Sequence, residues 1–417
     1  MNKYFARYYH NYLSSFLDFL VPKNKRTIKM GSEIKNEASE QYDYIVISDA
    51  LGYVYDIQNY LTKTQSLLKE NGRIVITQYN SLWEPILRFA SKINLRSALK
   101  IEQNWLSIND VKNFAELANL DVIKSGTKMI MPVYIPLVSD FLNKFVANIF
   151  PFSRMGIFHY VVLRQRLTEI IAKESKSFPS ISIIVPARNE AGTIEKIARD
   201  LPTLGAFTEI IFIEGNSTDN TYNEIVRVAE KFKNQKKIKY SKQTGIGKGD
   251  AVRKGFDMAT GDILTIYDAD MTVPSKEMEK FYNAIVENKG EFINGCRLIY
   301  PLQKESMRVL NILGNKFFSF AFSAILDQRM KDTLCGTKVL WKKDYEDIKI
   351  GRKFFGDFDP FGDFDLLFGA AKLNLKIIDL PIHYQERIYG ATNISRWKHG
   401  WLLLKMTIFA ARKIKFI

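Results

Sequence analysis

Two aspartates separated by one residue follow a short apolar run in the second half of the chain. The run Ile263 to Tyr267 is rich in β-branched residues and is short enough for a buried strand, and it ends at Asp268-Ala269-Asp270. Side chains at positions i and i+2 of an extended segment point the same way, so both carboxylates can reach one cation. Such oxygen ligands suit Mg²⁺ or Mn²⁺. A solvated turn would use the same residues, but ligands of α/β sheets collect beyond the carboxyl ends of strands, which favours a metal site.

Similar strand-and-loop pairs precede this one. The apolar runs 181–185 and 209–213 are followed by the polar loops 186–192 and 214–221, and a helix is expected from Thr193. The glycine-rich stretch 245–255 runs into another helix, where backbone amides and Lys248 could meet a pyrophosphate, although a plain glycine-rich turn is an alternative. The stretch lacks the Gly-Lys-Ser/Thr ending of a Walker loop. The recurrence predicts a doubly wound α/β sheet whose loops gather on one edge.

Residues 1–168 read as a separate, smaller α/β unit. Strands are expected at 44–48, 73–77 and 120–123, and helices at 55–69 and 107–118, with Asn71-Gly72 marking the turn between the first helix and the second strand. The polar residues 169–180 are interpreted as a linker. Residues 181–350 then form the larger core, and residues 351–417 form a final segment that ends in a basic, amphipathic helix.

The stretch Leu67-Leu-Lys-Glu-Asn-Gly-Arg-Ile-Val-Ile-Thr77 resembles the C-terminal half of a class I S-adenosylmethionine-dependent methyltransferase. Such enzymes begin with a strand, a glycine-rich turn and an acidic residue for the cofactor's ribose. Here residues 26–32 keep one glycine, Gly31, and eleven residues separate it from Asp43, too few for a helix, a strand and a second crossover. The resemblance therefore implies an incomplete Rossmann-like domain that acts as a scaffold or docking module and binds no S-adenosylmethionine. A working methyltransferase is the alternative.

Residues 180–395 resemble a family 2 glycosyltransferase of the GT-A fold, the nucleotide-diphospho-sugar transferase fold, in the branch of dolichyl-phosphate mannose and glucose synthases. The motifs that carry the resemblance occur in order: Val185-Pro-Ala-Arg-Asn-Glu190, Glu214-Gly-Asn-Ser-Thr-Asp219, Gly247-Lys-Gly-Asp-Ala251, Tyr267-Asp-Ala-Asp270, Gly295-Cys-Arg297, Asp332-Thr-Leu-Cys-Gly-Thr-Lys338 and Arg387-Ile-Tyr-Gly-Ala-Thr-Asn393. Each motif alone is weak evidence. The ordered set is specific.

The resemblance implies a donor site for a nucleotide-sugar. Asp268, Asp270 and Thr272 would hold the metal, with Thr272 at a position where relatives that make lipid-linked sugars often have glutamine. Glu214 lies where the family usually has aspartate and Gly215 where it often has a second one, so the nucleotide base stays open. The residues expected to contact the nucleotide-sugar are Pro186, Ala187, Arg188, Glu190, Glu214, Gly215, Lys248, Asp268 and Ala269.

The acceptor side carries a duplicated acidic motif, Phe355-Gly-Asp-Phe-Asp359 and Phe361-Gly-Asp-Phe-Asp365. Family 2 enzymes that act on sugar hydroxyls have a general base near here, and Asp365, then Asp363, match its place. A phosphate acceptor is already anionic and needs no base. Helix capping would also explain these acids. Arg297 and Arg387 match positions that would face a donor or lipid phosphate, for which arginine is suited.

The expected activity is an inverting, metal-dependent transfer of a hexose from a nucleotide-sugar to polyprenyl phosphate at a membrane surface. A glycan hydroxyl acceptor with Asp365 as base is the alternative within the same family. A nucleotidyltransferase and a non-catalytic scaffold built on the N-terminal domain are the alternatives from other classes.

Composition and charge limit the possible partners and the possible location of the chain. The net charge of +15 indicates anionic partners, but no nucleic-acid module is present, so no nucleic acid is expected. Two cysteines are too few for a disulfide framework and favour a reducing cytoplasm. The N-terminus lacks a signal-peptide core, and no stretch reads as membrane-spanning. The apolar and basic segments 309–326 and 401–417 suit interfacial helices on the cytoplasmic membrane face, with core packing as the alternative.

Overall fold

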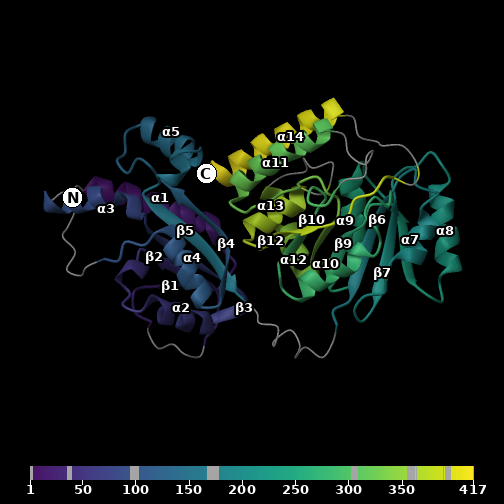
Figure 1. Cartoon of the computed structure of the whole chain (residues 1–417), viewed down its shortest axis with the longest axis horizontal. Helices are drawn as coiled ribbons and strands as arrows, with labels where there is room; N and C mark the ends of the chain where they lie inside the picture. The colour runs from purple at the N-terminus through teal and green to yellow at the C-terminus, as the bar shows by residue number, and fades with distance from the viewer. Residues whose placement is uncertain are drawn as a thin grey trace. The chain divides into compact units, whose positions relative to one another are not determined.

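The computed structural model describes residues 3–34, 40–93, 103–166, 178–301, 309–354, 362, 364–387, 389 and 396–416. The chain divides into two compact units (Figure 1). Unit 1 comprises Met1–Arg166 together with Arg412–Ile417, and unit 2 comprises Leu167–Ala411. The division after Arg166 falls two residues before the predicted end of the first domain. Most of the predicted linker 169–180 lies outside the described residues.

Unit 1 is built on a five-stranded mixed sheet. The two parallel pairs, β1–β2 and β2–β3, are followed by β5, which runs antiparallel to both of its neighbours, so the sheet order is β1-β2-β3-β5-β4. Long apolar runs make β2, β3 and β5 almost wholly buried, as expected for strands covered on both faces. The strands are β1 (Thr27–Met30), β2 (Tyr42–Ser48), β3 (Leu68–Tyr79), β4 (Leu120–Lys128) and β5 (Phe158–Gln165).

Helices cover both faces of this sheet. α1 (Lys3–Leu20) buries one apolar stripe that includes Phe16, whose ring packs on Tyr160 of β5 at 4.8 Å. α2 (Ile57–Ser66) and α4 (Ile108–Leu117) bury their apolar sides on the other face. α4 begins at a capping box in which Ser107 and Asp110 satisfy each other's backbone amides. Two shorter helices, α3 (Glu84–Lys92) and α5 (Val138–Lys144), lie outside these layers.

The predicted turn at Asn71-Gly72 is wrong, because these residues lie inside β3. Leu68 and Arg73 of β3 lie opposite Tyr42 and Tyr44 of β2, so the additional residues of β3 form an irregular bulge in the ladder. The buried guanidinium of Arg73 donates to the carbonyls of Asn71-Gly72 at 2.9 and 3.0 Å. These bonds satisfy the backbone inside the bulge, and the strand continues where a loop was expected.

Unit 2 contains a seven-stranded mixed sheet in the order β12-β10-β11-β9-β6-β7-β8. All strands but β11 point the same way, because β11 is antiparallel to both β9 and β10. The expected α/β class is confirmed, and the strand order reverses at β6 as in a doubly wound sheet. The strands are β6 (Ile181–Ala187), β7 (Thr208–Glu214), β8 (Lys237–Lys242), β9 (Ile263–Ile266), β10 (Phe292–Cys296), β11 (Lys338–Trp341) and β12 (Ile377–Pro381).

The helices of unit 2 lie on both faces of this sheet. α7, α8 and α10 bury their apolar sides in one core, whereas α9 packs on β6 from the other face, with Gly255 close against Ile184. α13 stacks Phe364 and Phe368 on Phe322 of α11. The helices are α7 (Ile194–Asp200), α8 (Thr221–Lys231), α9 (Lys248–Met258), α10 (Glu277–Val286), α11 (Val309–Leu326), α12 (Lys342–Gly351), α13 (Phe364–Lys372) and α14 (Arg396–Ala410), which a π-helical turn, Ala411–Lys415, follows.

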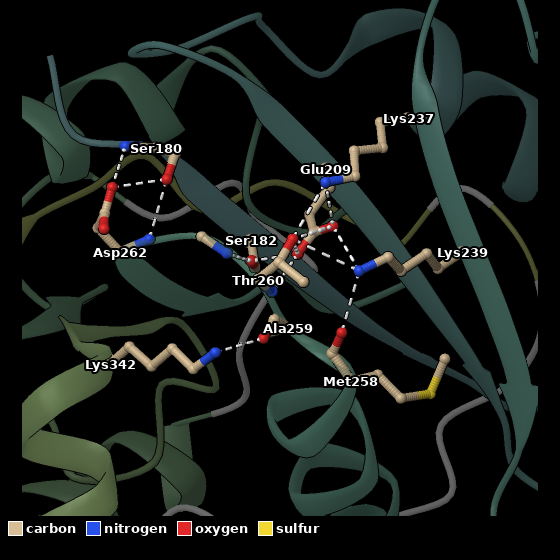
Figure 2. A network of polar contacts seen from close by, with 11 residues as sticks. Ser180, Ser182, Glu209, Lys237, Lys239, Met258, Ala259, Thr260, Asp262 and Lys342 are labelled. Atoms are coloured by element: carbon tan, nitrogen blue, oxygen red, sulfur yellow. Dashed lines mark hydrogen bonds and ion pairs between the residues drawn. The ribbon is translucent and has the colours of Figure 1, made fainter. Parts of the chain in front are cut away.

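A buried carboxylate joins the amino ends of four parallel strands in unit 2 (Figure 2). Glu209, at the start of β7, is fully buried and accepts bonds from Ser182 of β6 at 2.7 Å and from the amide of Thr260 at 2.6 Å. Lys239 and Lys237 of β8 pair with it at 2.8 and 3.2 Å. Burial alone would raise the pKa of Glu209, but the bonds from Lys239, Ser182 and Thr260 outweigh it and lower the pKa to about 2. The ionised Glu209 therefore holds these strands in register.

Candidate active site

The candidate site lies at the opposite, carboxyl edge of the unit 2 sheet. β6, β7 and β9 are parallel, so the loops that follow their last residues meet at one edge. The loops carry Glu190 after β6, Glu214 at the end of β7, and Asp268 with Asp270 after β9. The segment that follows β12 crosses this edge and adds Arg387.

Asp268 is held by a cation from the glycine-rich stretch. Lys248, the first residue of α9, places its ammonium 2.6 Å from Oδ1 of Asp268. Burial favours the protonated acid, but Lys248 and then the charges of Lys338 and Arg297 outweigh it and hold the pKa of Asp268 below its ordinary value. Gly336 lies against the same carboxylate, and a Cβ atom there would be 2.1 Å from Oδ2. Only glycine fits at that position without displacing Asp268.

Asp270 is held on both of its oxygens. The guanidinium of Arg387 lies 3.1 Å from Oδ2, while the hydroxyl and the amide of Thr272 donate to Oδ1 at 2.9 and 3.1 Å. Thr272, a predicted metal ligand, therefore contacts Asp270 as a hydrogen-bond donor. This contact fixes the orientation of the Asp270 carboxylate.

The same arginine reaches the loop after β6. Nη1 of Arg387 lies 2.8 Å from Oε1 of Glu190, so Arg387 bridges Glu190 and Asp270. Burial raises the pKa of Glu190 to about 7, with the Arg387 guanidinium opposing the shift and Asp270 adding to it. Oε2 of Glu190 is buried and has no hydrogen-bond partner within the described part of the chain. A buried acceptor of this kind is available to a ligand.

The residues around Arg387 were not predicted as site residues. Gln385 donates its amide to the carbonyl of Thr272 at 2.9 Å and its side chain to that of Met271 at 2.8 Å. The ring of Tyr389 covers Gly192, where a Cβ atom would lie 2.4 Å from the ring. The segment 384–387 and Tyr389 thus fasten the loop after β9 to the loop after β6. The sequence signal that could have identified them was their position, since Tyr389 lies within the Arg387 motif and Gln385 lies two residues before it.

The loops after β6 and β7 hold each other in place. Asn189 adopts a positive φ of 57° and accepts from the amide of Thr218 at 2.8 Å, while its own amide donates to the Ser217 hydroxyl at 3.0 Å. The amide of Glu190 donates to the hydroxyl of Thr221 at 2.9 Å. These bonds fix the place of the Glu190 carboxylate.

The other predicted donor residues line the same loops. Arg188 is exposed, whereas Ala187 and Glu214 are buried at the ends of β6 and β7. Glu214 accepts from the amide of Ser217 at 2.5 Å, so it shapes its own loop. Gly215 donates to the carbonyl of Ala187 at 2.8 Å and lies close to the Cβ atom of Arg188. Pro186 is half-buried in β6, and Ala269 is buried between the two aspartates.

Arg297 is engaged in a buried ion pair. Its guanidinium binds both oxygens of Asp332 at 2.7 and 2.9 Å and lies over the ring of Tyr384 at 5.2 Å. Burial would lower the pKa of Arg297, but Asp332 outweighs it and keeps the pKa well above its ordinary value. Asn315 of α11 donates to the same carboxylate at 2.7 Å. The charge of Arg297 is therefore balanced by Asp332.

Asp365 lies at the start of α13 and is buried. Its Oδ2 atom is 3.3 Å from Nε of Arg352 and 3.7 Å from Nη1 of Arg253. Gly362, three residues earlier, packs directly on Gly249 in the first turn of α9, next to Lys248 in the chain. Asp363 lies outside the described residues.

Comparisons with known proteins agree with the motifs. Residues 182–349 match the model of Glycosyl transferase family 2. Glycosyltransferase AglD of Haloferax volcanii is 22% identical over 213 residues, which are 50% of this chain and 33% of AglD. Dolichol-phosphate mannosyltransferase of Pyrococcus furiosus is 24% identical over 251 residues, which are 57% of this chain and 67% of that protein. The chain thus spans about a third of AglD.

A solved structure shows a weaker likeness. Glucosyl-3-phosphoglycerate synthase from Mycobacterium tuberculosis, crystallised with Mn²⁺ and UDP-glucose, has a TM-score of 0.42 and 16% identity, over 58% of this chain and 81% of that one. The family match falls within unit 2 and includes the motifs from Val185 to Lys338. Residues 182–349 of unit 2 are therefore a family 2 glycosyltransferase domain, which confirms the enzyme class that the ordered motifs predict.

Proposed function

We propose that the chain transfers a hexose, with inversion, from a nucleotide-sugar to polyprenyl phosphate at the cytoplasmic face of a membrane. One observation carries this proposal: Asp268, Asp270 and Glu190 converge at the carboxyl edge of a GT-A-type sheet, with Lys248 and Arg387 paired to them. Two neighbouring aspartates, a third carboxylate linked to Asp270 through Arg387, and the two cations suit a ligand that brings both a diphosphate and a divalent cation.

The donor set fits Mg²⁺ or Mn²⁺. Asp268 and Asp270 offer hard carboxylate oxygens from one short loop, and the part of the chain that is described holds no cluster of three or more potential metal-ligating side chains. Two protein carboxylates with donor phosphates completing the shell is the usual arrangement for Mg²⁺. When bound, the ion would neutralise charge on the departing nucleoside diphosphate as a Lewis acid.

The chain's own cations would exchange partners as the donor binds. Lys248 contacts Asp268 and stands at the amino end of α9, where helix amides attract anions. Its ammonium can turn to the diphosphate once Asp268 binds the metal. Arg387 can likewise leave Asp270 for a phosphate while it keeps Glu190. Glu190, with one oxygen unpartnered, is placed to accept a hydroxyl or amide proton from the nucleoside.

The acceptor assignment rests on the partners of Asp365. Its Oδ2 atom lies within 3.7 Å of the guanidinium groups of Arg352 and Arg253, so this carboxylate is already engaged by two cations. A phosphate acceptor needs no base, so this pairing favours polyprenyl phosphate over a glycan hydroxyl. The Pyrococcus furiosus relative is a dolichol-phosphate mannosyltransferase, which supports the same choice.

The outer surface of α11 supports an acceptor that resides in a membrane. Leu313, Phe317 and Phe320 follow one another at helical spacing and are exposed, while Phe318 and Phe322 point into unit 2. An exposed apolar stripe of this kind suits a helix lying in the bilayer interface. Among the described residues, no helix has the length and apolar character needed to cross a bilayer.

For unit 1 we propose a degenerate methyltransferase-like scaffold without S-adenosylmethionine. The carbonyl of Gly31, the one glycine kept from the expected cofactor turn, accepts from the hydroxyl of Tyr60 on α2. The Tyr60 hydroxyl thus occupies a backbone carbonyl of the turn where the cofactor would be expected to bind. Calorimetry with S-adenosylmethionine tests this part alone, and tight binding would contradict it.

A donor and acceptor screen tests the proposed activity. Purified full-length chain is incubated with UDP- and GDP-sugars, Mn²⁺ or Mg²⁺, and either a polyprenyl phosphate or a glycan alcohol. We expect metal-dependent transfer to the phosphate, little loss in Asp365→Asn, and no turnover in Asp268→Asn. A large loss in Asp365→Asn together with transfer to the alcohol would assign the hydroxyl acceptor instead.

A further inference from the structure

Helix α3 of unit 1 exposes an apolar stripe. Leu82, Ile86, Phe89 and Ile93 are spaced by four, three and four residues, which places them on one side of the helix and of the turn before it. All four are exposed, between 49% and 64%. An amphipathic helix of a water-soluble fold normally buries this side. The stripe therefore lacks the cover that a packed helix would have within the described part of unit 1.

A second segment of unit 1 exposes more apolar side chains. Residues 133–155, which include α5 and the 3₁₀ turns after it, present eleven large hydrophobic side chains to solvent, led by Leu137 at 85% and Phe150 at 68%. Contiguous apolar surface of this extent marks an interaction site. The eleven are Val133, Tyr134, Ile135, Leu137, Val138, Phe141, Phe145, Ile149, Phe150, Phe152 and Met155.

The two segments meet where the first begins and the second ends, and we call them together the apolar face (residues 82–93 and 133–155). The indole of Trp83 donates to the carbonyl of Met155 at 2.8 Å, and Asn80 donates to that of Gly156 at 2.9 Å. Asn143, which is buried, accepts from two backbone amides of residues 130–131 and donates to the hydroxyl of Tyr8 on α1. These bonds tie the two segments to each other and fasten the second segment to α1.

Charges on the apolar face are mainly basic. The two acids in these ranges are both engaged, Glu84 with Arg88 at 2.8 Å and Asp140 with the hydroxyl of Tyr8. The guanidinium of Arg154 lies over the ring of Phe150 at 5.2 Å, so its charge stands directly on the apolar surface. Four exposed cations oppose the two acids: Arg88, Lys92, Lys144 and Arg154.

The polar and charged groups of the apolar face indicate whether its partner is a bilayer or a protein. Apart from Tyr134, every exposed residue within its described ranges is apolar, a proline or charged, and the amide and aliphatic hydroxyl side chains there are half-buried (Ser91, Asn148, Ser153) or buried (Ser139, Asn143). Protein interfaces form about one hydrogen bond per 100–200 Å² of buried area. A bilayer interface needs apolar side chains for the acyl region and cations for anionic head groups.

We propose that the apolar face of unit 1 binds the surface of a bilayer containing anionic phospholipids, with α3 and α5 inserted at the level of the head groups. The inference does not depend on which acceptor unit 2 uses, because it concerns other residues and another unit. It gives unit 1 a role that requires neither a cofactor nor catalysis.

A fluorescent probe on the full-length chain tests the proposal locally. Cys296 and Cys335 are buried, so an introduced cysteine can be labelled selectively with an environment-sensitive dye. The dye is placed at Leu137→Cys and, as a matched control in the same unit, at Tyr55→Cys. Tyr55 is fully exposed and lies two residues before α2, a helix that Figure 1 shows well away from α5 within unit 1. Vesicles of phosphatidylcholine with phosphatidylglycerol are then added, and vesicles of phosphatidylcholine alone serve for comparison.

We expect a blue shift and quenching by a lipid-borne quencher at position 137 with the anionic vesicles, and neither at position 55. We also expect Ile86→Asp with Phe89→Asp to lower the vesicle affinity reported at position 137 by about tenfold or more. An unchanged spectrum at position 137 would overturn the proposal, even if the chain floats with vesicles through α11.

Two further results would also overturn it. If the unlabelled chain is a dimer by light scattering and Ile86→Asp with Phe89→Asp makes it a monomer, the apolar face binds a second copy. If the same substitutions sharply lower the melting temperature without vesicles, the face packs within the chain. We expect a monodisperse variant whose melting temperature is unchanged.

Discussion

Replacing Glu209 with glutamine should destabilise unit 2 far more than a typical surface change. The pKa of Glu209 falls from 4.5 to about 2 in the folded chain, and each pKa unit corresponds to about 1.36 kcal/mol. The ionised form is therefore worth about 3 kcal/mol to folding at neutral pH. Glu209→Gln removes this charge and leaves Lys237 and Lys239 without their shared carboxylate. For a domain of this size, 1 kcal/mol shifts the melting temperature by about 2–4 °C, so we expect a fall of roughly 6–12 °C.

Scanning calorimetry of the full-length chain measures this shift, with the transition of unit 1 as an internal reference. Because the folded-state pKa is depressed, the stabilisation is present above 4.5 and is lost as the pH falls from 4.5 toward about 2. The gap between wild type and variant should therefore close over that range. Glu230→Gln, in an exposed pair with Lys233, is the matched control and should change stability by less than about 1 kcal/mol. The reasoning would be refuted if the two substitutions had equal effects, or if the stability difference between wild type and Glu209→Gln did not change with pH.

Two substitutions test the geometry of the site. Gly336→Ala should push the Asp268 carboxylate out of place, because the new methyl group would lie 2.1 Å from it, and turnover should fall by about a hundredfold with little change in melting temperature. Gly314→Ala, which meets no atom within 4 Å, should leave turnover unchanged, and equal losses would contradict the steric argument. Arg387→Met should weaken nucleoside diphosphate binding by about tenfold to a hundredfold in calorimetry, and should raise the pKa of Glu190 further because Arg387 opposes the present shift. Undiminished affinity would remove Arg387 from the phosphate site.

The strands that carry the site were predictable because their burial leaves a local signal. The runs 181–185, 209–213 and 263–267 are apolar except for one residue each (Ser182, Glu209 and Thr265), and the strands observed there are buried almost throughout. Asp268 and Asp270 were predicted as site residues because they follow such a run directly. The antiparallel β11 was not predicted, since the direction of a four-residue strand depends on its neighbours in the sheet and not on its own sequence.

The sequence alone did not predict which residues far apart in the chain contact each other. Arg387 and Glu190 are separated by 197 positions, and only the folded sheet brings them together. The pairing of Arg297 with Asp332 likewise depends on where the segment after β10 passes the loop before β11. Asn71-Gly72 misled the prediction because a buried arginine supplied the hydrogen bonds that a turn would otherwise have made internally.

The apolar face of unit 1 could not be predicted from the sequence for a different reason. In the sequence, prolines and charges break the apolar run 129–152, so it does not read as membrane-spanning and gives no other signal. Side-chain exposure, which decides whether such a segment is core or surface, is a property of the fold. The stripe from Leu82 to Ile93 has helical spacing in the sequence, but spacing alone cannot tell which side of a helix is covered.

The central claim is that Asp268 and Asp270 hold a divalent cation against the diphosphate of a sugar donor. The most direct test is the equilibrium binding of nucleoside diphosphates, by calorimetry, to wild type and to Asp268→Asn with Asp270→Asn, each with and without Mn²⁺. We predict that wild type binds at least one nucleoside diphosphate only when Mn²⁺ is present, and that the variant, still folded, loses this binding. Metal-independent binding, or equal binding by the variant, would contradict the claim.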